Sequence, residues 1–146
     1  MSSVHPVQAQ PDDGWACGHL TPEEYRVYLN MDPRDREHGT RVAKRLLRNH
    51  PNVSPHVIAA AILHDCGKSI RRFSLLERVF LGLIPETLSA KCLPGWTEIR
   101  RTHPDLGRNI VRSAGGREVV ADLIARHHHP KDDPDANLLY RYDHSE

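Results

Sequence analysis

The sequence predicts an all-α fold, a bundle of about six to eight helices. Apolar residues recur at helical spacings in several segments, and three of these segments begin with Thr, Asp or Ser followed by proline, a common start of a helix. No segment alternates β-branched and polar residues as strands do. The 146 residues are enough for one domain with a buried core.

The first half of the chain contains three predicted helices after a polar start. Residues 1–18 are polar and show no periodicity, so we expect a disordered tail there and a helical domain over residues 19–146. Thr21-Pro22 predicts a short helix to about Asn30, and Asp32-Pro33 predicts a helix to about Asn49. Ser54-Pro55 predicts a nearly all-apolar helix that ends at Gly67.

The second half contains an apolar stretch over residues 74–84 and a weakly patterned segment over 85–95. Helices are expected over residues 96–102, 103–113 and 117–128, and from Pro134 onward. The apolar stretch could cover a pocket, form the face of a homodimer, lie on a membrane surface or pack in the core.

Composition excludes several classes of protein. The net charge of +1, with histidines neutral, gives no general basic field, so we expect no binding to duplex nucleic acid. No apolar run is long enough to span a bilayer, and the N-terminus lacks the pattern of a secretory signal. Three widely spaced cysteines without a CxxC pair favour reduced thiols and a cytoplasmic location.

His64 and Asp65 stand where apolar residues are expected. Asp65 follows Ile62 and Ile58 at spacings of three and seven, so its carboxylate shares their buried face. A carboxylate in such a place costs several kcal/mol unless a cation or strong hydrogen bonds compensate. A metal ion is the simplest compensation. Cys66, beside this pair, could be a further ligand, but we expect it to be a core residue.

Other polar residues continue the apolar stripes of other helices. A single buried histidine is ordinarily a hydrogen-bonded core residue, but stripes from several helices that converge on one core would bring such residues together. Imidazole and carboxylate ligands suit Fe, Mn, Co, Ni or Zn. With Asp65 as a bridge, the set could hold one ion or two ions about 3.5–4 Å apart. The candidate ligands are His38, His64, Asp65, His103, His127, His128 and Asp143.

These residues resemble the pattern of the HD-domain superfamily of metal-dependent phosphohydrolases. That family has an isolated His, a His-Asp pair that ends an apolar helix, and a distant Asp, which match His38, His64-Asp65 and Asp143. The form His-Asp-x-Gly-Lys is matched through Lys68. Members with two metal ions add His-Pro-x-x-Gly, matched by His103–Gly107, and a His-His pair, matched ambiguously within residues 127–129. The resemblance covers residues 34–146 and implies a helical bundle around a buried metal site.

Two departures separate the chain from the cyclic-dinucleotide branch of that superfamily, the HD-GYP family. Pro130-Lys-Asp-Asp-Pro-Asp stands in place of that branch's Asp-Gly-x-Gly-Tyr-Pro, and Arg34 stands where some members have an extra acidic ligand. We therefore expect a small, stand-alone HD hydrolase.

The resemblance implies hydrolysis of a phosphate ester, of a nucleotide or a similar small substrate, by metal-activated water. Asp65 is the candidate to orient the water, and Lys68 to neutralise phosphate charge. A lysine near a helix C-terminus is also favoured by the helix dipole alone. Arg71, Arg72 and Arg101 are candidates to bind the anionic substrate, or are ordinary surface charge.

Two other functions fit the same ligands. One is a di-iron oxygenase, and the other is a non-catalytic regulatory module that keeps its metal for folding. Lys68 and the arginines favour the hydrolase over the oxygenase, and the intact ligand set argues against a non-catalytic module.

Overall fold

A computed structural model describes residues 8–72 and 96–145, apart from the side chains of residues 70–72 and 96–102. This part of the chain contains helices and no strands, which confirms the all-α prediction. The expected elements over residues 74–84 and 85–95 lie outside the described residues. The helices are α1 (Asp13–Cys17), α2 (Pro22–Leu29), α3 (Pro33–Asn49), α4 (Pro55–Leu63), the 3-10 helix η1 (Cys66–Arg72), α6 (Trp96–Ala114), α7 (Glu118–Arg126) and α8 (Pro134–Asp143).

The predicted helix starts at Pro22, Pro33, Pro55 and Pro134 are confirmed, and all but α4, where Ser54 makes no capping hydrogen bond, have a side-chain cap. At α2 the Thr21 hydroxyl accepts from the Glu24 N–H at 3.2 Å, and the Glu24 carboxylate accepts from the Thr21 N–H at 3.0 Å, which forms a capping box. Asp32 accepts from the Arg34 N–H at α3, and Asp133 caps α8 in the same way. Proline occupies the first turn of all three helices.

The expected disordered tail is corrected at residues 13–17, which form α1 with Ala16 fully buried. Asp13 accepts hydrogen bonds from the Tyr28 hydroxyl at 2.6 Å and from Arg36 at 2.9 Å. Lys44 donates to Asp12 at 2.7 Å. A five-residue helix is too short to show periodicity, and its stabilising partners lie on α2 and α3.

Two other boundaries differ from those expected. The apolar helix ends at Leu63 instead of Gly67, and the chain continues through a turn into η1. The expected break before Pro104 is absent, because α6 runs without interruption from Trp96 to Ala114. A proline inside a helix costs about 3 kcal/mol. Pro104 is buried where α6 packs against α7 and η1, and this packing outweighs the cost.

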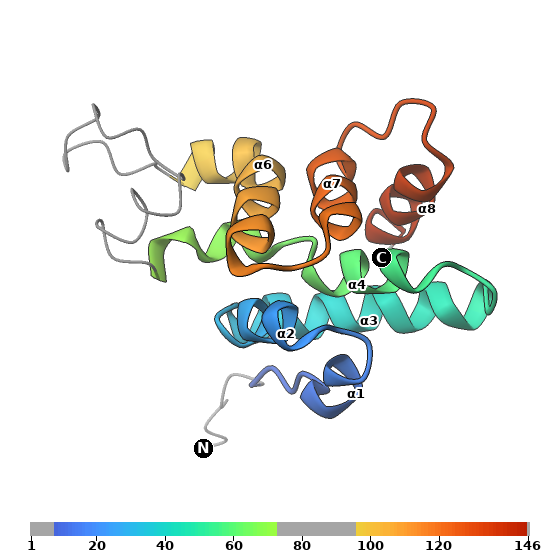
Figure 1. Cartoon of the computed structure of the whole chain (residues 1–146), viewed down its shortest axis with the longest axis horizontal. Coiled ribbons are helices and arrows are strands. Elements are labelled where there is room, and N and C mark those ends of the chain that lie inside the picture. Colours follow the sequence, from blue (N-terminus) through green and yellow to red (C-terminus); the bar gives the residue numbers. More distant parts are fainter. Residues whose placement is uncertain (1–7, 73–95, 146) are drawn as a thin grey trace, which may run out of the picture.

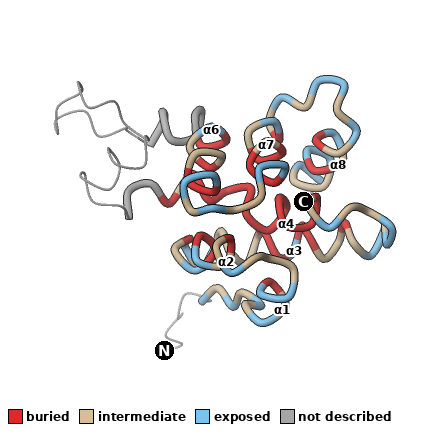
Figure 2. The backbone as a smooth tube through the Cα atoms, in the orientation of Figure 1, coloured by how far each residue is buried: buried red, intermediate tan, exposed pale blue. Residues whose placement is uncertain are grey.

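α4 lies at the centre of the fold. Every residue from Val57 to Leu63 is buried, as expected for a helix that is apolar on all sides. α3 packs along α4, α7 and α8 also contact α4, and α6 contacts α7 and η1. Figure 1 shows α6, α7 and α8 side by side above α3 and α4, and Figure 2 shows the buried backbone concentrated where these helices meet. None of the described helices combines the length and the apolar character that crossing a membrane requires.

Glycines allow the backbones to approach closely beside His38 and Asp65. A Cβ added to Gly39 would collide with the carbonyl oxygen of Ile62, so α3 and α4 touch there. A Cβ on Gly67 would collide with the carbonyl oxygen of His103, and one on Gly107 would lie 2.9 Å from Ile124. These contacts bring α3, α4, η1, α6 and α7 together around one region.

Candidate metal centre

A cavity of about 540 Å³ opens where these elements meet. Its walls carry mainly groups that can bind a metal ion or hold a charge. They are Asp35, His38, Asp65, Lys68, His103, His128 and Asp143.

His38 and Asp143 meet across 105 positions of sequence. The Nε2 atom of His38 lies 2.9 Å from Oδ1 of Asp143. His38 comes from α3 and Asp143 is the last residue of α8, so packing of α8 against α3 and α4 completes this pair. Burial alone would raise the pKa of Asp143, but hydrogen bonds with His38 and His64 lower it overall.

His64 is fully buried at the C-terminal end of α4. Its Nδ1–H donates to the carbonyl of Ala61 at 2.6 Å, which fixes the ring and directs Nε2 toward the carboxylates. Nε2 lies 3.1 Å from Asp143 and 3.4 Å from Asp65. Burial alone would lower the pKa of His64, but the charges of Asp65 and Asp143 raise it to about 9.

Asp65 faces two sides of the cavity with its two oxygens. Oδ2 lies 3.3 Å from Lys68 Nζ, and Oδ1 lies 3.2 Å from Nε2 of His103. Burial alone would raise the pKa of this carboxyl, but the charge of His64 and the hydrogen bond with His103 outweigh burial, and the pKa lies well below its usual value. Asp65 is therefore an ionised carboxylate that is only 5 % exposed.

His127 has a buried ring nitrogen that lacks a partner. Its Nδ1–H donates to the carbonyl of Ile124 at 2.6 Å, as His64 does to Ala61. Its Nε2 is buried and forms no hydrogen bond within the described part of the chain. Burial and the charge of His64 lower the pKa of His127 to about 3, so the ring is neutral. A neutral imidazole whose second nitrogen is fixed by a carbonyl is in the state that a metal ligand requires.

His128 lies beside His127 and His103, with ring centroids 4.2 Å and 4.6 Å away. Burial and the neighbouring His103 lower its pKa to about 4. Potential ligand atoms lie within 4.8 Å of one another in three groups. The groups are His38, His64 and Asp65; His64, His127 and Asp143; and His103, His127 and His128.

A comparison with known proteins agrees with this geometry. The family model of the HD domain matches residues 36–146. The chain belongs to the HD-domain family. HD domains bind divalent metal ions and generally act as metal-dependent phosphohydrolases. No curated protein and no solved structure matches the chain.

The donors of this HD domain fit such an ion. Five histidines and two carboxylates converge, and the unpartnered Nε2 of His127 points to a ligand that is not a protein group. Nitrogen and oxygen donors of this kind suit transition-metal ions. The structure brings together all the metal ligands predicted from the sequence, which are His38, His64, Asp65, His103, His127, His128 and Asp143. Lys68 lines the cavity, and its side chain is 35 % exposed.

His129 and Cys66 lie outside the metal centre of this HD domain. His129 is exposed and belongs to none of the three groups. Cys66 is fully buried with its Sγ 3.6 Å from the Gly107 carbonyl, and burial raises the pKa of its thiol, so it is a core residue. The side chains of Arg71, Arg72 and Arg101 lie outside the described residues.

Asp35 is the cavity residue that sequence analysis missed. It lies three positions before His38, on the same side of α3, and lines the cavity. Burial and the nearby charge of Asp65 raise its pKa. The sequence offered one indication of this position, because residues three apart on a helix lie on the same face and Asp35 is three positions from His38.

Proposed function

We propose that this protein is a metal-dependent phosphohydrolase that cleaves a phosphate ester of a nucleotide or a similar small substrate with activated water. The observation that carries the proposal is the clustering of seven His and Asp donors, five of which line one cavity, with a buried His127 nitrogen that has no partner among the described residues. Membership of the HD-domain family supports the same class of reaction.

The proposed ligands form two halves joined by Asp65. His38, His64, Asp65 and Asp143 would hold one ion. His103, His127 and His128 would hold a second, together with the Asp65 oxygen that faces His103. Fe, Mn, Co, Ni and Zn all suit this donor set. Bound ions would polarise the phosphate and lower the pKa of the attacking water.

The protein groups around the cavity have separate proposed roles. Asp65 would accept a hydrogen bond from the attacking water and orient it toward phosphorus. The ammonium group of Lys68, held 3.3 Å from Asp65, would contact the phosphate oxygens and offset their charge as the ester bond breaks. Arg71, Arg72 and Arg101 are proposed as further phosphate contacts. The volume of about 540 Å³ is within the usual range of small-molecule sites.

A cytoplasmic location is part of the proposal. Cys17 and Cys66 are free thiols, which is typical of proteins in a reducing compartment.

The test compares Asp65→Ala with Asp105→Ala. Asp105 is an exposed carboxylate on α6 that does not line the cavity. Protein purified without chelator is analysed for metal and assayed for phosphate release from nucleotides, dinucleoside polyphosphates and sugar phosphates, with Mn, Co, Ni or Fe added. Asp65→Ala should lower kcat by at least about 100-fold, since metal polarisation is worth several kcal/mol. Asp105→Ala should retain the wild-type rate.

The same assays separate the alternatives. Oxygen uptake by anaerobically prepared iron protein, without phosphate release, indicates an oxygenase. Bound metal without turnover of any substrate indicates a regulatory module. Phosphate release that persists in Asp65→Ala contradicts the proposed mechanism.

A further inference from the structure

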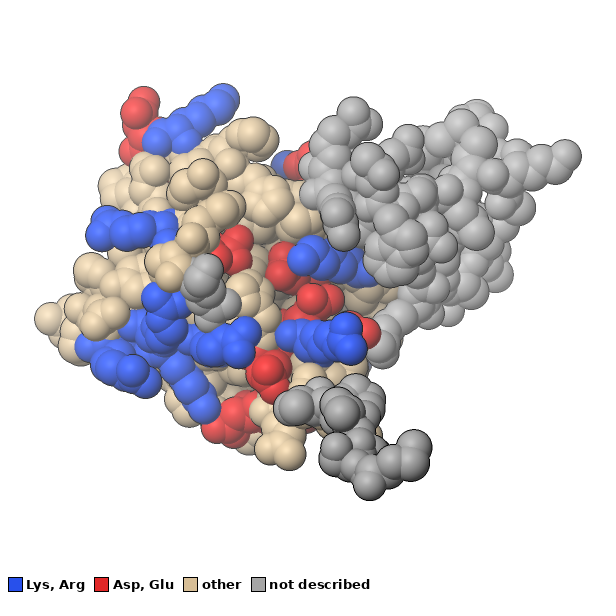
Figure 3. Space-filling model, turned by 180° about the vertical axis from the view of Figure 1, so that it is seen from behind, with Lys and Arg blue, Asp and Glu red and all other residues tan. Residues whose placement is uncertain are grey.

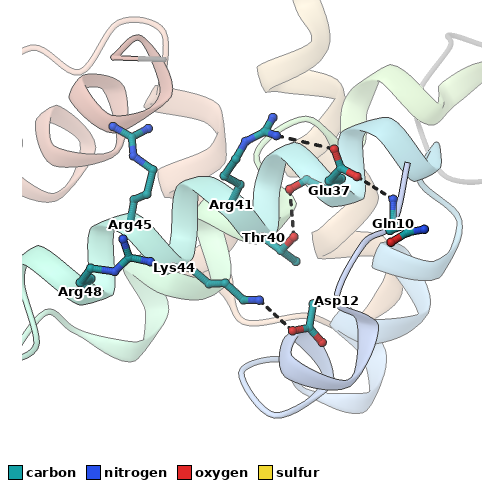
Figure 4. Close-up of a pocket in the computed structure, with 8 residues that line it drawn as sticks. All are labelled: Gln10, Asp12, Glu37, Thr40, Arg41, Lys44, Arg45 and Arg48. Carbon is teal, nitrogen blue, oxygen red and sulfur yellow. Dashed lines mark hydrogen bonds and ion pairs between the residues drawn. The ribbon is translucent and has the colours of Figure 1, made fainter. Parts of the chain in front are cut away.

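A second hollow, distinct from the metal centre, lies along the side of α3 that faces away from α4. Its volume is about 240 Å³. Figure 4 shows its side chains rising from α3, with the segment before α1 at one end, and Figure 3 shows lysine and arginine side chains gathered over the C-terminal half of α3. We call it the α3 groove. Its charged residues are the cations Arg41, Lys44, Arg45 and Arg48 and the acids Asp12 and Glu37.

The spacing of the four cations is unfavourable for the helix itself. Arg41 and Lys44 are three positions apart, as are Arg45 and Arg48, and Lys44 and Arg48 are four apart. Side chains at these spacings are neighbours on a helix, and like charges there destabilise it. An anion bound between them would remove this repulsion.

Among the described residues, the two acids of the groove pair with cations toward its N-terminal end. Asp12 pairs with Lys44 at 2.7 Å, and Glu37 pairs with Arg41 at 3.6 Å. At the other end Arg48 forms no hydrogen bond or ion pair with the described residues. Arg48 is therefore available to bind an added anion.

Arg45 is already oriented in this part of the groove. Its guanidinium lies 5.7 Å from the ring centre of Tyr142 and donates to the Ser145 hydroxyl at 2.8 Å. A guanidinium held in place loses less freedom when it binds a ligand.

We propose that the α3 groove binds a small anion with two or more linked phosphate groups, of which pyrophosphate is the simplest. The cations from Arg41 to Arg48 extend over about 10 Å of helix, which suits a short phosphate chain. A long nucleic-acid backbone fits less well, because Asp12 and Glu37 close one end with negative charge and the chain has a net charge of only +1. The proposal does not depend on the function of the metal centre.

Calorimetric titration with pyrophosphate tests this site in the full-length, metal-containing protein. The double variant Arg41→Gln/Arg48→Gln removes two groove cations. The control Arg26→Gln/Arg112→Gln removes the same charge from exposed sites elsewhere on the protein. We expect one pyrophosphate per chain in the groove, in addition to any bound at the metal centre. The groove affinity should be at least about tenfold weaker in the groove variant and within about twofold of wild type in the control, because charge-assisted hydrogen bonds are local.

Thermal unfolding checks that each variant is folded. The groove variant should melt no lower than wild type without ligand, since like-charge repulsion is reduced, and pyrophosphate should raise its Tm less than it raises that of the wild type. Equal weakening in both double variants would indicate a general charge effect and overturn the proposal. Undiminished binding in the groove variant would place the anion elsewhere and also overturn it, as would wild-type protein that binds duplex DNA or an acidic peptide but no pyrophosphate.

Discussion

The two halves of the metal centre differ in how many of their polar atoms have protein partners when no ion is bound. In the half formed by His38, His64, Asp65 and Asp143, one Asp143 oxygen contacts both histidines and Asp65 contacts His64. The half formed by His103, His127 and His128 has no carboxylate of its own, and it contains the unpartnered His127 nitrogen.

The two halves also differ in the protonation of their histidines, and therefore in whether they can bind a metal ion directly. The pKa of His64 is raised to about 9, so the first half contains a protonated imidazole that must release its proton to become a ligand. The pKa of His127 is lowered to about 3 and that of His128 to about 4, so these rings are already neutral. His64 must therefore release a proton before it binds a metal, whereas His127 and His128 can bind one without that step.

Asp143→Ala should have the largest effect, because it removes the acceptor shared by His38 and His64. We expect metal affinity to fall at least about 100-fold and the free energy of unfolding to fall by about 3 kcal/mol, since the buried His64 cation loses a partner. Metal analysis and urea unfolding measure the two quantities. Asp135→Ala, which removes a half-exposed carboxylate of α8 that pairs with His56, is the control. Full metal occupancy in Asp143→Ala would contradict the assignment.

His127→Leu should separate metal binding from stability. The side chain keeps similar bulk and loses the unpartnered nitrogen, so the metal-free protein should unfold within about 1 kcal/mol of wild type. Metal content should fall by one ion per chain. His129→Leu should leave the metal content unchanged, because His129 is exposed and outside the ligand groups. A metal content equal to wild type in His127→Leu would remove His127 from the ligand set.

The metal-free protein should also show a pH dependence of stability with opposite signs from the two halves. The stabilising contribution of His64 is complete below its unfolded pKa of 6.5 and is lost as the pH rises through about 9. The contribution of His127 is complete above pH 6.5 and is lost as the pH falls toward 3.

Chemical unfolding of chelator-treated protein is measured between pH 5 and 6.5, because most carboxylates titrate at lower pH. In this range the pH dependence of the free energy of unfolding reports the neutral histidines of the second half. Stability should fall on acidification by up to about 1.4 kcal/mol per pH unit for each neutral histidine. His127→Leu should reduce this slope and leave the part due to His128. An equal slope in wild type and variant would refute the depressed pKa of His127.

The sequence predicted the parts of this fold that depend on local signals. Thr21 and Asp32 cap helices as predicted, because a short polar side chain before a proline-led turn favours a cap. Helical spacing also identified His38, His64 and Asp143 as inward-facing. The HD-domain resemblance proved right over residues 36–146.

The parts that sequence analysis missed depend on contacts between distant segments. α1 is stabilised by Tyr28, Arg36 and Lys44, and a continuous α6 depends on packing around Pro104. Asp35 was passed over because an acid in the first turn of a helix is common for reasons unrelated to any cavity. Nothing in the sequence distinguishes the cations of the α3 groove from ordinary surface charge.

The distance in sequence between His38 and Asp143 has a consequence for biosynthesis. A ribosome adds roughly 5–20 residues per second, so several seconds pass after His38 is made before its partner 105 positions later exists. During that interval His64 and Asp65 have no Asp143 beside them, and an ion captured early would have an incomplete set of ligands. Productive metal loading must therefore follow translation of α8, and a nascent chain stalled before Asp143 would expose an apolar core with an unmatched charge at its centre.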